Sequence, residues 1–330
     1  MQNRIILAAT AASAIALAGS AAQSADFTLR IHTLVQSPHP YNDMAVFMEE
    51  RLEAESDGRI DVRVFDSGQL GQDPAVIGEM GLGSVDLMIS TTSNAAEQIP
   101  EFAIFTMPYL FSSMDDVLET VGPGTEIHEH FQQVYDERGV GMRLLALGAS
   151  GTRNLSTAEV PVESIEDLQG LQMRTPPSPM DSETWSALGM LPVSVDWGEL
   201  YAAMQTGVAE AMESSLPGYT GSKLYEVAPN LALTAHTIQV NHTSMSTATW
   251  ESLPEDLQEL VQEVAIAANE HGVEMAKQYD DELVETLQEE HGVNVTRPDT
   301  QAFRDALAPI QQQLAEDLDL VEEYELVTRE

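Results

Sequence analysis

The sequence predicts an α/β protein of two lobes with a ligand cleft between them. Three observations indicate this fold class. Strand-like and helix-like segments alternate through the first half of the chain, the alternation repeats in the second half, and one later helical segment is too long for a single small lobe. Two α/β units joined by extended crossovers are typical of a hinged molecule.

The first unit contains three expected strands and two expected helices. Apolar residues that alternate with polar ones predict strands, and apolar residues at helical spacing predict the first helix. A turn rich in Gly and Pro precedes the second helix. We expect strands at 27–35, 60–65 and 85–90, a helix at 41–55, and a short helix after the turn at 67–74.

The second unit repeats this order. A capping signal begins at Ser164 and predicts a short helix that ends at Gly170. Prolines follow the second strand of this unit, and a glycine ends each of its two later helices. We expect strands at 141–147 and 171–174, and helices at 180–188 and 197–206.

A long helical segment begins after Pro254 and reaches about residue 290. At about 1.5 Å per residue it would be about 50 Å long, so we expect it to pack across both lobes, with a bend or interruption at Gly272. The expected organisation is a signal peptide at 1–25, lobe I at 26–150 plus about 240–280, and lobe II at 151–239 plus part of 281–330.

Composition excludes several classes of function. The 330 residues include 14 basic and 54 acidic side chains, a net charge of −40, so the chain has no basic surface for nucleic acid. It has no cysteine, which excludes disulfides, thiolate metal sites and cysteine nucleophiles. An acid-rich surface with few lysines suits concentrated salt, and we therefore expect a halophilic source.

The N-terminus has the pattern of a secretory signal. Arg4 precedes an apolar, Ala-rich run at 5–18, and small residues follow at 19–25. The run is shorter than the roughly 18 residues that a membrane span needs. We expect cleavage between Ala22 and Ala25 and export to the periplasm; a buried N-terminal helix is the alternative.

Two arginines lie in long windows without acidic residues. Arg153 is in the window 139–158, and Arg174 is in the window 168–180. A guanidinium without a carboxylate nearby in the sequence is free to hold an external one, and its fork matches a carboxylate bidentately. Pairing with an acid from a distant part of the chain, or capping of a helix, is equally open for each.

Four segments carry a resemblance to a known family. They read GQLGQD at 68–73 with GSVDL at 83–87, FTMPYLF at 105–111, DLQGLQMRTP at 167–176 and WGELYAAMQTGV at 197–208. The chain resembles the DctP-type solute receptors of tripartite ATP-independent periplasmic (TRAP) transporters over essentially the whole mature length. The resemblance implies the two-lobed periplasmic binding protein fold, and it implies capture of a small organic acid such as a sugar acid, uronate or dicarboxylate. It also implies delivery to DctQ-like and DctM-like membrane subunits.

The resemblance also implies site residues. Arg174 occupies the position that grips the substrate carboxylate, Arg153 the position of an assisting arginine, and Ser214 stands where the family usually has asparagine. The remaining candidates each have a structural alternative as well, namely a helix cap, a surface histidine or a core aromatic. They are Asn94, Thr91, His39, Trp197 and Tyr219.

Rival functions remain open to different degrees. An exported enzyme is disfavoured, because G-x-S-x-G and H-E-x-x-H are both absent. A sensor receptor would share the fold and the ligand chemistry, and a zwitterionic osmolyte such as ectoine would use the same arginine. We expect no cofactor, no metal site, no nucleic-acid partner and a monomer.

Overall fold

The computed structural model of the protein describes residues 25–329. The predicted signal peptide at 1–25 lies outside the described residues except for Ala25. No helix within the described residues is long and apolar enough to cross a membrane.

The elements alternate in the order that the sequence predicts. The strands are β1 (Phe27–His32), β2 (Ile60–Phe65), β3 (Leu87–Thr91), β4 (Met142–Thr157), β5 (Gln172–Thr175), β6 (Leu191–Ser194), β7 (Ala211–Ser215), β8 (Asn230–Ser246) and β9 (Asn294–Thr296). The α-helices are α1 (Pro40–Glu55), α2 (Asp73–Gly81), α3 (Thr92–Ala95), α4 (Met114–Val121), α5 (Glu126–Arg138), α6 (Pro179–Ala187), α7 (Leu200–Gln205), α8 (Leu216–Gly221), α9 (Thr247–Ser252), α10 (Glu255–Glu289), α11 (Thr300–Leu307), α12 (Gln311–Asp317) and α13 (Val321–Thr328). The 3-10 turns are η1 (Pro100–Thr106), η2 (Ile165–Leu168), η3 (Trp197–Glu199), η4 (Leu224–Glu226) and η5 (Ala308–Ile310).

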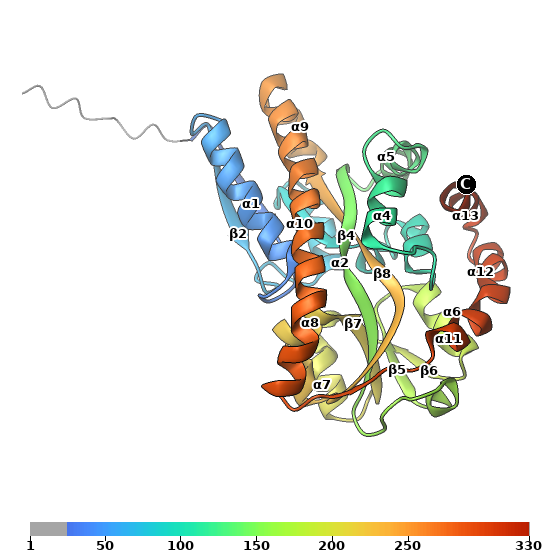
Figure 1. Ribbon diagram of the computed structural model, residues 1–330. Helices are drawn as coiled ribbons and strands as arrows, with labels where there is room; N and C mark the ends of the chain where they lie inside the picture. The colour runs from blue at the N-terminus through green and yellow to red at the C-terminus, as the bar shows by residue number, and fades with distance from the viewer. Residues whose placement is uncertain (1–24, 330) are drawn as a thin grey trace, which may run out of the picture.

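One nine-stranded sheet runs through the molecule in the order β2-β1-β3-β8-β4-β7-β5-β6, with β9 beside β8. β1 is parallel to β2 and β3, and β5 is parallel to β6 and β7, whereas β4 and β8 are long antiparallel strands that join the two halves. We call β1–β3 with α1–α5 lobe I, and β5–β7 with α6–α8 lobe II (Figure 1). The two-lobed α/β fold is confirmed. The residue boundaries of the lobes stay a prediction, because β4, β8 and α10 belong to both.

The middle of the sheet is irregular. The pairing of β4 with β8 shifts its register between Ala149 and Thr152, and Gly151 in this bulge has a φ of +122°. Bulges bend a strand and increase its twist. This bulge lies where β4 and β8 pass from lobe I to lobe II.

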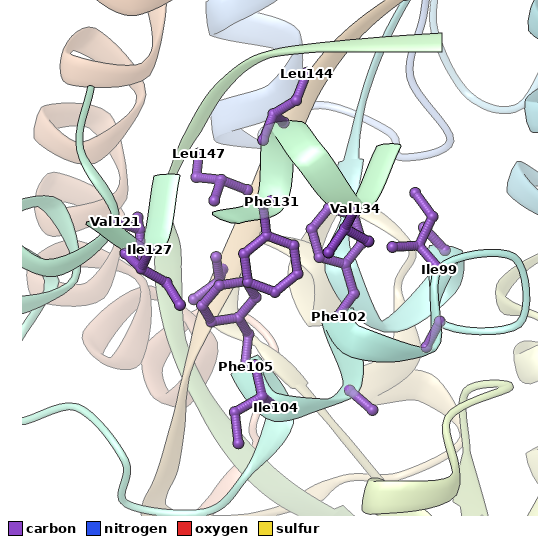
Figure 2. Close-up of a cluster of buried hydrophobic side chains, with 14 of the residues drawn as sticks. Ile99, Phe102, Ile104, Phe105, Val121, Ile127, Phe131, Val134, Leu144 and Leu147 are labelled. Atoms are coloured by element: carbon purple, nitrogen blue, oxygen red, sulfur yellow. The ribbon is translucent and has the colours of Figure 1, made fainter. Parts of the chain in front are cut away.

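An aromatic cluster fills the core of lobe I (Figure 2). Phe102 stacks on Phe131 with ring centroids 5.0 Å apart, and Phe105 lies 4.8 Å from Phe131. Leu144 and Leu147 of β4 belong to the same cluster. The apolar area that these side chains bury fixes η1 and α5 against the sheet.

The long helix α10 crosses both lobes, as predicted (Figure 1). Its first half buries residues such as Val261 in the lobe I cluster that contains α1, and its last turns bury Leu287 in the lobe II cluster. The predicted interruption at Gly272 is wrong, because α10 is one continuous helix; a bend at this position stays a prediction. Gly272 instead leaves room for Met44, whose Sδ would lie 2.5 Å from a Cβ at this position.

Candidate ligand-binding site

A pocket lies between the lobes, at the ends of β1 and β3 in lobe I and of β5 and β7 in lobe II. Open α/β sheets hold ligands at the carboxyl ends of their parallel strands. About 30 Å³ of free space remains between the lining side chains, which is room for one or two water molecules. The side chains that line the pocket therefore lie close together. Its lining residues are Leu34, Val35, His39, Tyr41, Asp73, Thr91, Ser93, Asn94, Arg153, Arg174, Pro176, Trp197, Ser214, Ser215 and Gln239.

Arg174 is a buried cation of this pocket. It lies on β5, is 1% exposed, and donates a hydrogen bond from Nε to the carbonyl oxygen of Val195 at 2.8 Å. Its Nη2 has no hydrogen-bond partner, and no carboxylate of residues 25–329 lies within 4.0 Å of its guanidinium nitrogens. Burial lowers the pKa of Arg174 to about 10, so the group stays charged at neutral pH. A buried, unpaired charge is destabilising, and a ligand carboxylate would compensate it.

Arg153 differs from Arg174 because it is already paired. Its Nη2 donates to Oε1 of Glu213 at 2.6 Å, its Nε contacts the other carboxylate oxygen, and its Nη1 contacts Oε1 of Gln239. Burial would raise the pKa of Glu213, but Arg153 and His236 outweigh burial and hold this pKa below its usual range. The structure therefore corrects the interpretation of Arg153 as a cation free of carboxylates. The structure shows the alternative, in which Arg153 pairs with an acid from a distant part of the chain.

Sheet register explains this ion pair. Arg153 on β4 is opposite Ser215 of β7 and Thr237 of β8. Glu213 and Gln239 are each two residues from those partners, so they project from the same face of the sheet at diagonal positions. Three neighbouring strands thus bring the arginine, the acid and the amide together.

Asp73 is the buried acid that lobe I contributes to the pocket. It begins α2, is 1% exposed, and accepts hydrogen bonds from the amide of Asn94 at 2.7 Å and from the hydroxyl of Ser90. His32 Nε2 lies 3.0 Å from its other oxygen. Burial would raise the pKa of Asp73, but these hydrogen bonds and His32 outweigh burial and lower it. The carboxylate is therefore ionised and held rigidly at the pocket wall.

His39 and Thr91 line the pocket and also cap helices. Nδ1 of His39 accepts a hydrogen bond from the backbone N–H of Tyr41 at the start of α1, and the hydroxyl of Thr91 accepts one from Ser93 at the start of α3. Burial, assisted by Arg153, lowers the pKa of His39 to about 3. His39 is therefore a neutral polar group at every pH near neutrality. Asn94 lines the pocket as well, with its amide committed to Asp73.

Trp197 and Ser214 complete the lobe II wall. The Cζ of Arg174 lies 5.7 Å from the centroid of the Trp197 ring, within the range of a cation–π contact. Gly218 permits this placement, because a Cβ there would lie 3.2 Å from the indole and 2.7 Å from Oγ of Ser214. Trp197 also packs against the lobe II core. It therefore lines the pocket and is also a core aromatic, which are the two roles considered for it.

Tyr219 does not line the pocket, which corrects the expectation that it does. Its side chain is buried in the lobe II core, and its hydroxyl donates to the carbonyl oxygen of Ala228 at 2.7 Å. It lies on the short helix α8, which follows β7 directly. The alternative interpretation, a core aromatic, is the one that the structure shows.

Several pocket groups were not predicted as site residues. Asp73 lies within the family-like segment 68–73, so its position could have been found from that motif. Glu213 directly precedes Ser214, and its pairing with Arg153 becomes visible only when β4 and β7 are placed side by side. Tyr41 and Gln239 carry no local signal; the amide of Gln239 donates to the Tyr41 hydroxyl at 2.6 Å.

The pocket combines charged and neutral polar groups. The described residues include no group of three or more His, Asp or Glu side chains arranged to hold a metal ion. Among residues 25–329 the guanidinium of Arg174 has no carboxylate within 4.0 Å, that of Arg153 is paired with Glu213, and the carboxylate of Asp73 faces the pocket from the opposite lobe. The remaining polar groups of the lining are neutral hydroxyls, amides and an imidazole. Such a set can hold an anion at one end and hydroxyl or amine donors at the other.

The fold and this pocket define a two-lobed solute-binding protein. The profile of the DctP family, described as bacterial extracellular solute-binding protein, family 7, matches residues 31–317. The chain belongs to this family. The predicted resemblance to TRAP solute receptors is therefore confirmed.

Relatives show what such pockets bind. The chain is 33% identical over 277 residues to a solute-binding protein of Roseobacter denitrificans (84% of this chain and 82% of the relative). It is 31% identical over 260 residues to an ectoine-binding periplasmic protein of Halomonas elongata (77% and 75%). The crystal structure of a TRAP periplasmic solute-binding protein of R. denitrificans with bound L-galactonate superimposes with a TM-score of 0.81 at 29% identity, covering 91% of this chain and 99% of that one.

Proposed function

We propose that the protein is the extracytoplasmic receptor of a TRAP transporter and binds a small sugar acid whose carboxylate pairs with Arg174. The unpartnered Nη2 of this buried guanidinium is the observation that carries the proposal. A charge-assisted hydrogen bond to a carboxylate contributes about 1.5–3 kcal/mol. Two such bonds in the fork of one guanidinium supply much of the free energy that micromolar binding needs.

The rest of the lining supports a hydroxylated ligand over a purely apolar acid. Asp73, Asn94, Ser214 and Gln239 bring hydrogen-bonding groups from both lobes to one pocket. Each sugar hydroxyl can both donate and accept, so it suits a wall in which carboxylate, amide and hydroxyl groups alternate. The galactonate-bound relative supports the same class. A dicarboxylate is less favoured, because Glu213 already occupies Arg153.

A zwitterionic osmolyte of the ectoine type is the second candidate. Arg174 and Asp73 place opposite charges on opposite lobes, and the ring of Trp197 lies beside the cation. A ligand with a carboxylate and a delocalised cation could use both charges. The ectoine-binding relative from H. elongata supports this alternative.

The remaining parts of the proposal concern the cell. We infer that residues 1–25 direct export, that the mature chain is a monomer, and that its ligand-bound form delivers the solute unchanged to a small and a large membrane subunit. Ligand binding would favour the closed arrangement of the lobes, which the membrane subunits would then recognise. No catalytic turnover is expected.

A thermal-shift panel tests the substrate class. L-Galactonate, D-glucuronate, succinate and ectoine would each be added to the protein in about 1 M NaCl, where distant acidic charges are screened. A ligand at a hundredfold excess over its Kd stabilises by about 2.7 kcal/mol. We expect a sugar acid to stabilise most and galactitol, which lacks the carboxylate, to have no effect. Stabilisation by ectoine alone would favour the second candidate, and recovery of a chemically altered ligand would indicate an enzyme.

A further inference from the structure

We propose that Gln72 is a positioning residue: its side-chain amide closes the pocket by bonding to the backbone of Gly198 in the opposite lobe. We call this pair the interlobe latch. The inference rests on the proposed function, since it concerns how the bound solute is retained. Gln72 itself does not line the pocket.

The latch is a single hydrogen bond that crosses between the lobes. Gln72 occupies the N-cap position of α2 in lobe I, but its side chain does not cap the helix. Its Oε1 accepts an exposed hydrogen bond from the backbone N–H of Gly198 in η3 of lobe II at 3.1 Å. No other side-chain hydrogen bond of Gln72 is present among residues 25–329. The contact therefore contributes to closure and to little else.

Each partner of the latch adjoins a pocket residue. Gln72 directly precedes Asp73, which supplies the buried acid of lobe I, and Gly198 directly follows Trp197, which covers Arg174. Gln72 is joined to Asp73 by one peptide unit, and Gly198 is joined to Trp197 in the same way. When the latch forms, it therefore brings Asp73 and Trp197 to their positions in the pocket.

The latch also stands between the pocket and solvent. A second hollow of about 570 Å³ is lined by Gln72 and Gly198 and shares Leu34 and Trp197 with the pocket. The hollow therefore adjoins the pocket at Leu34 and Trp197, on the side of the latch. In this proposal, a solute that leaves on this side separates Gln72 from Gly198.

Glycine at position 198 lets the amide approach. A Cβ there would lie 2.3 Å from Nε2 and 3.0 Å from Cδ of Gln72, so alanine would displace the amide without touching the pocket. Gly198→Ala and Gln72→Ala should therefore have the same effect. Their combination should add little, because both remove one interaction.

The test measures release of the sugar acid identified by the thermal-shift panel, by stopped-flow tryptophan fluorescence. A neutral hydrogen bond supports a change of about three- to tenfold, so we expect Gln72→Ala and Gly198→Ala each to speed dissociation by that factor. Gln72→Glu keeps an acceptor oxygen and should restore slow release. Gln69→Ala is the matched control, because the side chain of exposed Gln69 bonds to Asp66 in its own turn and to no other residue of 25–329.

A distance measurement separates this inference from the proposed function. The chain has no cysteine, so Leu82→Cys in lobe I and Gln205→Cys in lobe II would carry the only two spin labels. We expect Gln72→Ala to lower the closed population at least twofold. If no acid binds the wild-type protein, the proposed function fails. The distances between the two spin labels then test the latch on their own. Unchanged release and unchanged distances in Gln72→Ala, or equal effects of Gln72→Glu and Gln72→Ala, would overturn it.

Discussion

Replacing Arg174 by methionine should stabilise the ligand-free protein. Methionine fills much of the same volume without a charge. Burial lowers the pKa of Arg174 from 12.5 to about 10, which at about 1.4 kcal/mol per pKa unit corresponds to roughly 3 kcal/mol of destabilisation of the charged form. Loss of the hydrogen bond to Val195 removes about 1 kcal/mol. The expected net change is a gain of about 2 kcal/mol in the free energy of unfolding.

The same substitution should weaken binding of the sugar acid. Two charge-assisted hydrogen bonds of about 1.5 kcal/mol each amount to about 3 kcal/mol, or roughly a hundredfold in Kd. Titration calorimetry measures this loss, and urea unfolding of the ligand-free protein measures the gain in stability. Arg174→Lys should bind weakly as well, because an ammonium cannot reproduce the fork.

Arg153→Met is the matched control. It would remove the guanidinium partner of Glu213, which is 0% exposed, and leave only His236 Nε2 at 3.6 Å among the cationic groups of residues 25–329. Breaking a buried ion pair in this way destabilises by about 3–5 kcal/mol. The same substitution at two neighbouring arginines should therefore change stability in opposite directions. Equal destabilisation by both variants would refute the reasoning, since it would mean that the charge of Arg174 is compensated within the protein.

Three further predictions concern packing, pH and salt. Gly272→Ala should destabilise the protein by about 1–3 kcal/mol, because the added Cβ would meet buried Met44. Gly78→Ala, with open space around it, should stabilise the protein by about 0.5–1 kcal/mol. Urea unfolding of both variants measures these changes. Burial, assisted by Glu213, raises the pKa of Asp181 from 3.8 to about 6, so ionisation of Asp181 lowers the free energy of unfolding as pH rises through this interval. Between pH 4 and pH 7, the stability of Asp181→Asn relative to wild type should therefore increase by roughly 2 kcal/mol. Raising NaCl from about 0.1 M to about 1 M shortens the Debye length from about 10 Å to about 3 Å. Because the net charge is −40, this screening should raise the free energy of unfolding by at least about 1 kcal/mol. A urea unfolding midpoint that does not rise with salt would contradict the halophilic interpretation.

Local patterns were sufficient to predict some elements of both lobes, whereas β6, β7, β8 and the helices after α10 were not predicted. The period-2 alternation of residues 60–65 gave β2 with the bounds that the structure has, and the break at 254 gave the start of α10. Periodicity did not predict the full length of β4, because its second half contains Gly151 and polar residues that lie in the interlobe region. Sequence alone could not show that Gly272 accommodates Met44, since the two residues belong to different helices.

The candidate site was predictable in part for a similar reason. Arg174 stands out because its window contains no acid, and among residues 25–329 no carboxylate lies within 4.0 Å of its guanidinium nitrogens. The same argument misled for Arg153, because Glu213 lies 60 residues away and reaches it only through strand pairing. Long-range pairings of this kind depend on sheet register, which a local window does not contain.

The most direct test of the account is a crystal structure of the protein with the sugar acid that stabilises it most. The account predicts that both carboxylate oxygens of the ligand lie within hydrogen-bond distance of the guanidinium nitrogens of Arg174, with the hydroxyls directed toward Asp73 and Asn94. A ligand carboxylate bound elsewhere, with Nη2 of Arg174 still without a partner, would contradict it.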